Sequence, residues 1–389
     1  MKNVATVTVI LIVIVAVAGT LFAGCLSSGF DPSELQAPEI VYAETVRDEE
    51  PSLSDPGHPD NPHITLKWSI TEEIYARAGG ALWLNVENEN PSGRLYIYGF
   101  GIEWEDGTST YRNCSTYVDS QQEISLGLLV FNAPSEPGPQ RYSIVANAAS
   151  SKIVRGQLGQ AFEVWRHRTV VMPSEHRANV LPLIEEHEQN VERNNAPYYA
   201  KINSLVSYEA ANGIADQIKA RWPGTGKYNI MQVIEAYEWV RKNITYRQDV
   251  GSDHWQSASE TLSKMSGDCE DHAILLASMI GALGGNARVN IVEGHAFSTV
   301  FIGTDEQRVA EVRAAVASYY GMPVEQMPIS YLVDDTGYWL IVDTTGFPYA
   351  GGLPTQSGYT SPERDWSIRS DFLYMIDATG DSIWNLIPF

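Results

Sequence analysis

The sequence predicts an all-β sandwich domain followed by an α+β domain, and three observations lead to this fold class. The chain has 389 residues, which is enough for two ordinary domains. Short β-patterned stretches separated by turn signals fill residues 39–168. Helical periodicity then dominates, and the strand pattern returns only from residue 288 onward. Helices followed by strands are typical of an α+β domain, which we place at residues 174–389.

Residues 39–168 are expected to form the sandwich, which would be immunoglobulin-like in the loose sense. Leu82, Leu84 and Val86 alternate with more polar neighbours, as on a half-buried strand. Turn signals such as Asn90-Pro-Ser-Gly93 separate successive strands. Several short strands at regular spacing favour an antiparallel sandwich. Nothing in this domain indicates catalysis.

The second domain is expected to begin with helices and to end with strands. Four helical patterns come first, at Ser174–Asn190, Lys201–Trp222, Ile230–Asn243 and about Asp268–Leu283. Strands are then expected at Arg288–Val292, His295–Ile302, Gly337–Thr344, Phe372–Ile376 and Trp384–Phe389. The segment Gln307–Tyr320 has helical periodicity, and we expect it to form a lid or rim over a cleft.

The helix expected at residues 268–283 carries a thiol at its N-terminal tip. Asp268 suits the N-cap, Asp271 can complete a capping box, and Gly284 ends the run. Cys269 then occupies the first helical position. There the helix dipole and the unpaired backbone N–H groups favour a thiolate, so the pKa of the thiol is expected to be lowered. A nucleophile needs such a thiolate, whereas a core cysteine would more often lie in mid-helix.

The first 24 residues have the character of a targeting segment. Lys2 precedes an apolar run, and Leu21-Phe-Ala-Gly-Cys25 resembles the lipobox of secreted lipoproteins. That resemblance implies cleavage before Cys25 and lipid on its thiol. The alternative is an uncleaved N-terminal membrane anchor, because the apolar run approaches spanning length. Either places the protein at a cell membrane on the extracytoplasmic side, with residues 25–38 as a linker.

Composition limits the classes of partner. The formal net charge of −22 argues against nucleic acid or an anionic lipid surface as a partner. The chain has three cysteines, Cys25, Cys114 and Cys269. Once the lipidated residue is set aside, the other two lie in different expected domains, so a disulfide framework is absent. Cys114 is therefore expected to be a buried or half-buried free thiol.

Thiol, imidazole and carboxylate groups recur together in acyl-transfer sites. The thiolate attacks a carbonyl carbon, the imidazole takes and returns the proton, and the carboxylate orients the imidazole. The candidates here are Cys269 at a helix start, His295 at a strand start and Asp343 at a strand end. His295 or Asp343 alone would more often have a structural role, whereas the position and flanking motif of Cys269 already favour a nucleophile. The occurrence of all three together favours the catalytic interpretation.

Three motifs resemble the transglutaminase-like superfamily. Gly267-Asp-Cys-Glu-Asp-His-Ala273 is similar to its nucleophile helix, Gly294-His-Ala-Phe-Ser-Thr-Val300 to its histidine strand, and Trp339-Leu-Ile-Val-Asp-Thr-Thr345 to its aspartate strand. The resemblance covers roughly residues 230–350. It implies a papain-like α+β core and a Cys-His-Asp triad, all three positions of which are filled here. It does not fix the reaction, because the superfamily includes transglutaminases, peptidases, amidases and members that lost the triad.

The remaining candidate groups are less well specified. An oxyanion could be bound by the backbone N–H of Cys269 together with Trp255 or Gln256, although a core tryptophan and a surface amide are equally good interpretations. His272 is a rival imidazole on the same helix as Cys269. Cys269, His272 and His254 match no spacing typical of a zinc site. No acidic loop resembles the calcium site of animal transglutaminases, and we expect neither a metal nor a cofactor.

The sequence therefore predicts a membrane-anchored extracytoplasmic cysteine enzyme that cleaves or transfers amide or isopeptide acyl groups. Its substrate would be a protein or a cell-wall peptide. Hydrolysis is favoured over cross-linking, because water is the default acceptor. The alternative is a non-catalytic cell-surface module, for binding or structure, with a degenerate transglutaminase-like scaffold. The oligomeric state is left open.

Overall fold

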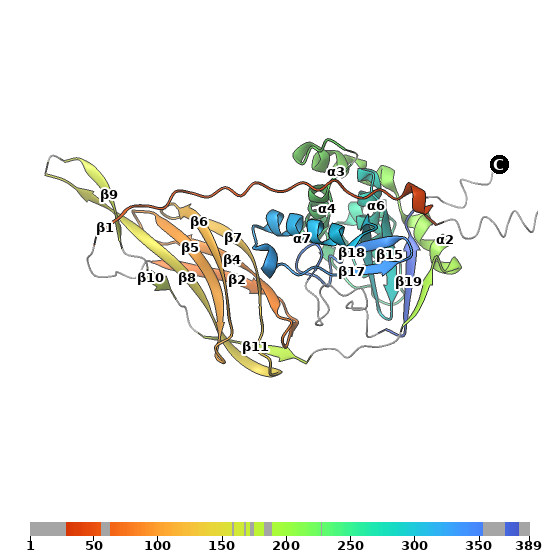
Figure 1. The fold of residues 1–389 in the computed structure, drawn as a ribbon, viewed down its shortest axis with the longest axis horizontal. Coiled ribbons are helices and arrows are strands. Elements are labelled where there is room, and N and C mark those ends of the chain that lie inside the picture. Colours follow the sequence, from red (N-terminus) through yellow and green to blue (C-terminus); the bar gives the residue numbers. More distant parts are fainter. Residues whose placement is uncertain are drawn as a thin grey trace, which may run out of the picture.

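A computed structural model of the protein describes residues 29–55, 63–157, 159–166, 169–171, 175–182, 189–226, 228–352 and 370–380. The predicted targeting segment with Cys25 and the strand predicted at Trp384–Phe389 lie outside these residues. Figure 1 shows two regions side by side along the long axis of the molecule. One is rich in β-strands, and the other combines helices with a separate sheet.

The N-terminal region contains two main sheets. The smaller sheet is antiparallel and has the order β2-β4-β7, with bounds Ile64–Ile70, Gly80–Asn88 and Glu123–Phe131. The larger sheet contains β1 (Leu53–Asp55), β3 (Ile74–Tyr75), β5 (Leu95–Trp104), β6 (Ser109–Val118), β8 (Gly138–Arg155), β9 (Ala161–Arg166), β10 (Thr169–Val171) and β11 (His176–Leu181). The alternation predicted on β4 is confirmed, since Leu82, Leu84 and Val86 are buried. The intervening residues Trp83, Asn85 and Glu87 are only partly buried.

One predicted helix of the second domain is wrong. Residues 176–181 of the expected helix Ser174–Asn190 instead form β11, which pairs antiparallel with β8 and parallel with β3. Val180 is buried in the core at this point. The residues of β8 that pair with β11 lie 34 or more positions earlier in the chain, at residues 138–142. Such long-range pairing overrides a weak local helical period, and local periodicity cannot reveal it.

The second region is built around one mixed sheet and its helices. The sheet has the order β12-β19-β15-β16-β18-β17, with bounds Asn190–Arg193, Phe372–Asp377, Ala287–Val292, His295–Gly303, Gly337–Val342 and Tyr331–Asp334. The helices are α2 (Ala196–Leu205), α3 (Tyr208–Arg221), α4 (Ile230–Asn243), α5 (Ala258–Lys264), α6 (Cys269–Leu283) and α7 (Glu306–Tyr320). The single helix predicted at 201–222 is thus two helices, because Ser207 caps a new N-terminus with its side chain.

Helix α6 is the centre of this region. Its capping box between Asp268 and Asp271 is present as predicted, and Gly284 ends it in a left-handed conformation with φ of 99°. The helix packs against α3, α4 and α5 on one side and against β15 and β16 on the other. It is therefore buried almost all round.

Helix α7 is present where predicted, but it does not cover a cleft over Cys269. Trp83 from β4 contacts the ring of Tyr320 at a centroid distance of 6.0 Å and lies 5.2 Å from the guanidinium of Arg241. Helix α7 thus lies at the contact between the two regions. Within the part of the chain that the structure describes, no α7 residue lines the pocket at Cys269. The expectation of a lid or rim is wrong for this reason.

The segment that precedes β1 runs along both regions (Figure 1). Glu39 forms a β-bridge with Asn229, and the backbone N–H of Ala43 donates to the hydroxyl of Ser318 at 3.1 Å. Further along, the backbone N–H of Tyr117 in β6 donates to the carboxylate of Asp48 at 3.0 Å. The segment therefore links the helical region to the β-rich region by specific hydrogen bonds.

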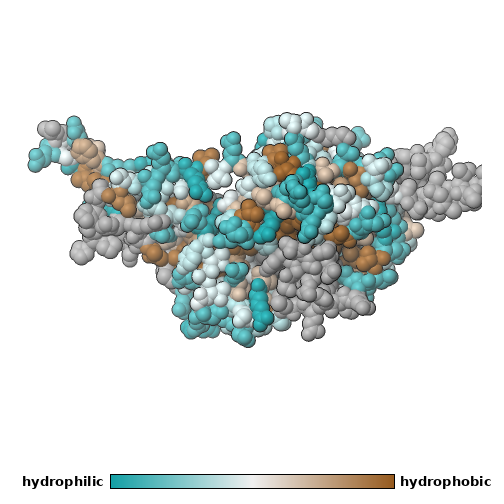
Figure 2. All heavy atoms as spheres, viewed as in Figure 1, coloured by the Kyte–Doolittle hydropathy of each residue, from teal (hydrophilic) through white to brown (hydrophobic). Residues whose placement is uncertain are grey.

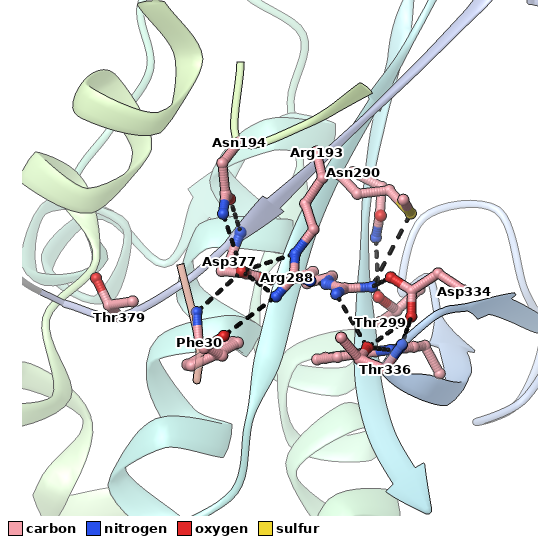
Figure 3. A network of polar contacts seen from close by, with 12 residues as sticks. Phe30, Arg193, Asn194, Arg288, Asn290, Thr299, Asp334, Thr336, Asp377 and Thr379 are labelled. Carbon is pink, nitrogen blue, oxygen red and sulfur yellow. Dashed lines mark hydrogen bonds and ion pairs between the residues drawn. The ribbon is translucent and has the colours of Figure 1, made fainter. Parts of the chain in front are cut away.

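A buried ion-pair network fastens the start of this segment (Figure 3). Arg288 on β15 donates to Asp377 on β19 at 2.7 Å and to Asp334 on β17 at 2.7 Å. The other oxygen of Asp377 accepts the backbone N–H of Phe30 at 3.0 Å and a guanidinium N–H of Arg193 at 2.8 Å. Because Arg288 and Asp377 are fully buried, their charges must be paired within the protein.

The face of the molecule drawn in Figure 2 is mainly hydrophilic where its residues are described. Figure 2 shows hydrophobic residues scattered among hydrophilic ones on this face of the molecule. Across the described ranges, no helix has both the length and the apolar character needed to cross a membrane.

Candidate active site

Cys269 opens helix α6 and faces a pocket. Gly267 immediately before it lies on the short strand β14 (Ser266–Gly267), which pairs in parallel with β13 (Thr245–Tyr246). That pairing fixes where the chain turns into the helix. The thiol is half-buried, and its sulfur lies 3.2 Å from a carboxyl oxygen of Glu270. Both Cys114 and Cys269 are free thiols in the described ranges, as the sequence predicted.

His295 and Asp343 come together across two neighbouring strands. His295 begins β16, and Asp343 directly follows β18, with which β16 pairs antiparallel. The Nε2 atom of His295 lies 3.0 Å from Oδ2 of Asp343. The Asp343 side chain is only 2% exposed, so this contact is shielded from water. The antiparallel register therefore brings together two groups that are 48 positions apart in the sequence.

The other oxygen of Asp343 is held by the turn that follows it. Oδ1 accepts the backbone N–H groups of Thr345 at 2.9 Å and of Gly346 at 3.0 Å, and the Thr345 hydroxyl at 2.8 Å. Burial by itself raises the pKa of Asp343. The positive charge and hydrogen bond of His295 and the Thr345 donors outweigh it, so the pKa lies below its usual value. Asp343 is therefore an ionised group that can orient an imidazole.

Cys269 and His295 line the same pocket, which has a volume of about 470 Å³. Aromatic and acidic side chains form much of the wall, namely Tyr198, Tyr246, Asp249, Asp253, Trp255, Asp268, Glu270 and Phe372. The pocket thus opens beside the sulfur and the imidazole, and Asp343 lies behind the imidazole. The arrangement can hold a substrate carbonyl next to a thiol that has a base within the same pocket.

The two predicted oxyanion candidates have different positions. Trp255 lines the pocket, and its indole N–H donates to Asp253 at 2.9 Å. Gln256 is not among the described residues that line the pocket. Its backbone and side-chain N–H groups both donate to the carboxylate of Asp271. Gln256 therefore holds the capping box of α6, and of the two candidates only Trp255 lines the pocket.

The thiol of Cys269 is not activated in the way the sequence suggested. Burial, followed by the nearby carboxyl of Glu270, raises the pKa of Cys269 to about 12. A hydrogen bond from the backbone N–H of Ala296 acts in the opposite direction, but more weakly. The helix N-terminus does not lower the pKa as expected, because the acidic side chains of its first turn and the partial burial of the thiol outweigh its effect.

Glu270 is itself perturbed. Burial, with a contribution from the neighbouring Asp253, raises the pKa of Glu270 to about 8. The sequence reasoning did not single out this residue, because a glutamate in the first turn of a helix is usually a solvated dipole partner. Its side chain is nevertheless buried, and the sequence pattern around it gives no sign of that burial.

The rival imidazole of His272 lies outside the pocket. Its Nδ1 is 3.0 Å from the hydroxyl of Thr344, and the side chain is buried beside α6. Burial lowers the pKa of His272 to about 4, so the ring is neutral at physiological pH. His254 pairs with Glu260 at 3.2 Å. Within the described ranges, no three His, Cys, Asp or Glu side chains converge well enough to hold a metal ion.

Comparison with known proteins identifies the same part of the chain. Residues 216–344 match the family model of the transglutaminase-like superfamily. No curated protein matches the chain. A candidate cysteine protease from Cytophaga hutchinsonii, solved as a crystal structure, shares 13% identity over 75% of this chain and 79% of its own, with a TM-score of 0.23. A candidate protease from Parabacteroides distasonis shares 11% identity over 60% of this chain and 64% of its own, with a TM-score of 0.22. TM-scores this low do not establish a shared fold, so the likeness to the transglutaminase-like superfamily depends on the match of residues 216–344 to the family model.

Proposed function

We propose that this protein is a cysteine enzyme that cleaves or transfers the acyl group of an amide or isopeptide bond, because residues 216–344 match the family model of the transglutaminase-like superfamily. Cys269 would be the nucleophile, His295 the general base and acid, and Asp343 the residue that orients His295. The observation that carries the proposal is the 3.0 Å contact between His295 and Asp343 beside the pocket that Cys269 lines. A non-catalytic scaffold would have no need to keep this contact next to an open pocket.

The first half of the reaction would form a thioester. Because Nε2 of His295 is hydrogen-bonded to Asp343, Nδ1 is the atom that would take the proton from the Cys269 sulfur. The thiolate attacks the carbonyl carbon, and the carbonyl oxygen becomes an oxyanion near the N-terminus of α6. As the C–N bond breaks, the imidazolium gives its proton to the departing amine. Because the pKa of Cys269 is high at rest, proton transfer would accompany attack and not precede it.

The second half would release the acyl group. His295 takes a proton from the incoming water or amine, which attacks the thioester carbon, and the proton returns to the sulfur as it leaves. Water gives hydrolysis, and an amine gives transfer. We favour hydrolysis, since the pocket opens to solvent and water is the most abundant acceptor. A fold of the papain-like α+β type, with an immunoglobulin-like sandwich before it, would be consistent with this assignment.

The test is to trap the thioester and to remove the nucleophile. The purified protein is incubated with a panel of peptide amides and isopeptides, and acyl–Cys269 is sought by mass spectrometry after acid quenching. We expect Cys269→Ala and His295→Ala to lose turnover by a factor of about 10³ or more. Cys114→Ala is the matched control, because that thiol is half-buried in the β-rich region and should keep full activity. A Cys269→Ala protein with undiminished turnover would disprove the proposal.

The proposal includes a location. The lipobox-like residues 21–25 support attachment of the protein through lipid on Cys25, facing the extracytoplasmic side of a cell membrane. Metabolic labelling with an alkyne fatty acid tests this. The label should appear on the wild-type protein and disappear in Cys25→Ala. Label that persists in the variant, or no label on either protein, would contradict the lipid anchor.

A further inference from the structure

We infer that the pocket beside Cys269 recognises a positively charged group of the substrate, namely the ammonium of a lysine side chain or the guanidinium of an arginine, close to the acyl group that is attacked. This inference rests on the proposed function for the identity of the substrate. The recognition itself depends only on the walls of the pocket. It would make the enzyme selective for basic sequences among peptide or protein substrates.

The first observation is the charge of the lining. Four carboxyl groups line the pocket, from Asp249, Asp253, Asp268 and Glu270. Among the described residues that line it, none is a lysine or an arginine. Burial raises the pKa of Asp268 as well as that of Glu270, as expected where carboxyl groups lack cationic partners. Asp268 and Glu270 are the buried members of this group, and two neighbouring carboxyl groups with low solvent exposure are costly unless a cation joins them.

The second observation is an unpaired oxygen on Asp268. This side chain is only 6% exposed, and its Oδ1 atom has no hydrogen-bond partner in the protein. Asp268 nevertheless lines the pocket next to Cys269. Buried carboxylate oxygens almost always accept a hydrogen bond, so an orphan of this kind indicates that a donor arrives with a ligand. An ammonium or guanidinium group would supply both the donor and the charge.

The third observation is the aromatic wall. Tyr198 stacks against Trp255 at a centroid distance of 6.0 Å, and both line the pocket together with Phe372. The faces of aromatic rings attract cations, and their apolar surface suits the methylene groups of a long basic side chain. The protein already shows this preference, because the ammonium of Lys201 lies 3.5 Å from the centre of the Trp255 ring.

An organic cation fits better than a metal ion. No three acidic, histidine or cysteine side chains of the described ranges converge on one point as metal ligands must. The pocket of about 470 Å³ can instead hold a side chain of the size of lysine. A bound cation would also act on the nucleophile. The positive charge of the cation would offset the effect of the Glu270 carboxyl group, which is one cause of the raised pKa of Cys269.

Binding to the Cys269→Ala protein tests the inference without any turnover. The probes are Nα-acetyl-lysine amide and Nα-acetyl-norleucine amide, which have side chains of similar length and differ in the ammonium group. Titration calorimetry at low salt should give the lysine probe about tenfold or higher affinity, with the preference weakening in 0.5 M NaCl. Equal affinity for the two probes, or tighter binding of norleucine amide, would overturn the inference.

Charge-neutralising variants locate the effect. Asp268→Asn retains an N-cap side chain for α6 while removing the negative charge, and Asp253→Asn removes the charge beside Trp255. Each should reduce the preference for lysine several-fold in the Cys269→Ala background. Asp216→Asn is the matched control, because Asp216 is an exposed residue of α3 that does not line the pocket. A preference that survives both pocket variants, or that falls equally in the control, would overturn the assignment.

Failure of this inference can be told apart from failure of the proposed function. If thioester formation is seen but basic and neutral substrates have the same kcat/KM, the enzyme assignment stands and the cation preference is wrong. If the lysine probe binds selectively but no acyl–Cys269 forms, the pocket assignment stands and the catalytic one is wrong.

Discussion

The sulfur of Cys269 lies 3.2 Å from Oε2 of Glu270, the next residue of the same helix. The two groups therefore compete for protons: the carboxyl raises the pKa of the thiol to about 12, and the pKa of the carboxyl is itself raised to about 8. At neutral pH the resting site holds a thiol and, for the most part, a neutral carboxyl group. Activation of the nucleophile then depends on His295 and on what enters the pocket.

Replacing Glu270 with glutamine should make Cys269 more reactive at a given pH. The amide cannot carry negative charge, so the pKa of the thiol should fall, although burial keeps it above that of a free cysteine. The measurement is the rate of alkylation by iodoacetamide at Cys269 between pH 6 and 10, followed by peptide mass spectrometry. We expect the variant profile to be shifted to lower pH.

Cys114 provides an internal control for that experiment. Burial raises the pKa of Cys114 to about 11, and Glu270 is not among the causes. Its alkylation profile should therefore be the same in both proteins. A shift at Cys114 of the same size as that at Cys269 would show a general loosening of the fold, and an unchanged profile at Cys269 would disprove the role of Glu270.

Substituting Gly346 with alanine should damage the site more than the fold. A Cβ atom at this position would lie 2.4 Å from Oδ2 of Asp343, the oxygen that contacts His295. The carboxylate would have to move, and the orientation of the imidazole would be lost. We expect turnover to fall by about 10²-fold or more while far-ultraviolet circular dichroism stays the same.

Gly213→Ala is the matched control for that substitution. Gly213 lies within α3, and a Cβ atom there would meet nothing within 4 Å. Alanine is the better helix former by about 1 kcal/mol, so this variant should be at least as stable as the wild type and equally active. Equal activity of both glycine variants would mean that Asp343 does not need its observed position.

The sequence predicted which groups form the candidate site better than it predicted their protonation. Cys269, His295 and Asp343 each begin or end an element, and short motifs mark those ends, so the caps of α6 and the strands β16 and β18 could be anticipated. The high pKa of the thiol could not be anticipated, because it arises from burial in the folded protein and from the nearby carboxyl group of Glu270. The local sequence pattern predicts where the helix begins, but it does not predict how far the folded chain buries the residues at that end.

The same limit explains the errors in the fold. Strand β11 was expected to be helical, since its pairing partner in β8 is far away in the sequence. Helix α7 was expected over the pocket, but it packs against α4 and β16, and its last residue, Tyr320, contacts Trp83 in the other region. In both cases the prediction failed because the burial of the segment depends on residues that are distant in the sequence. Long-range contacts decided the remainder.

His272 should make the stability of the protein depend on pH in mildly acidic solution. Its folded pKa is about 4, against an ordinary value of 6.5, so the unfolded chain binds a proton first. This contribution is fully present above pH 6.5 and is lost as the pH falls toward 4. The difference in pKa corresponds to about 3 kcal/mol, an upper bound for this side chain.

The raised pKa values of Glu270 and Asp271 act in the opposite sense, since these groups bind protons more readily when folded. The test is therefore a comparison of urea unfolding between the wild type and His272→Gln at pH 7 and pH 4.5. The wild type should lose more of its unfolding free energy than the variant over this interval. An identical loss in the two proteins would show that His272 is not buried as a neutral ring.

Breaking the Arg288–Asp377 pair should release the N-terminal segment as well as weaken the sheet. Asp377→Asn leaves the guanidinium of Arg288 deep in the core with Asp334 as its remaining carboxylate, and it weakens the acceptor that holds the backbone N–H of Phe30. Removing one partner of a buried ion pair costs about 3–5 kcal/mol. We expect a fall of that size in the unfolding free energy and faster proteolysis within residues 29–43.

Lys67→Met separates this effect from the general loss of an ion pair. Lys67 pairs with Glu87 and Glu123 on the exposed face of the small sheet, where its side chain is 50% exposed. Exposed pairs contribute about 1 kcal/mol or less, so this variant should unfold close to the wild type and be cut no faster. If Asp377→Asn loses stability while cleavage at residues 29–43 stays at the wild-type rate, the network supports only the sheet. The N-terminal segment would then be held by its later contacts, from Glu39 onward.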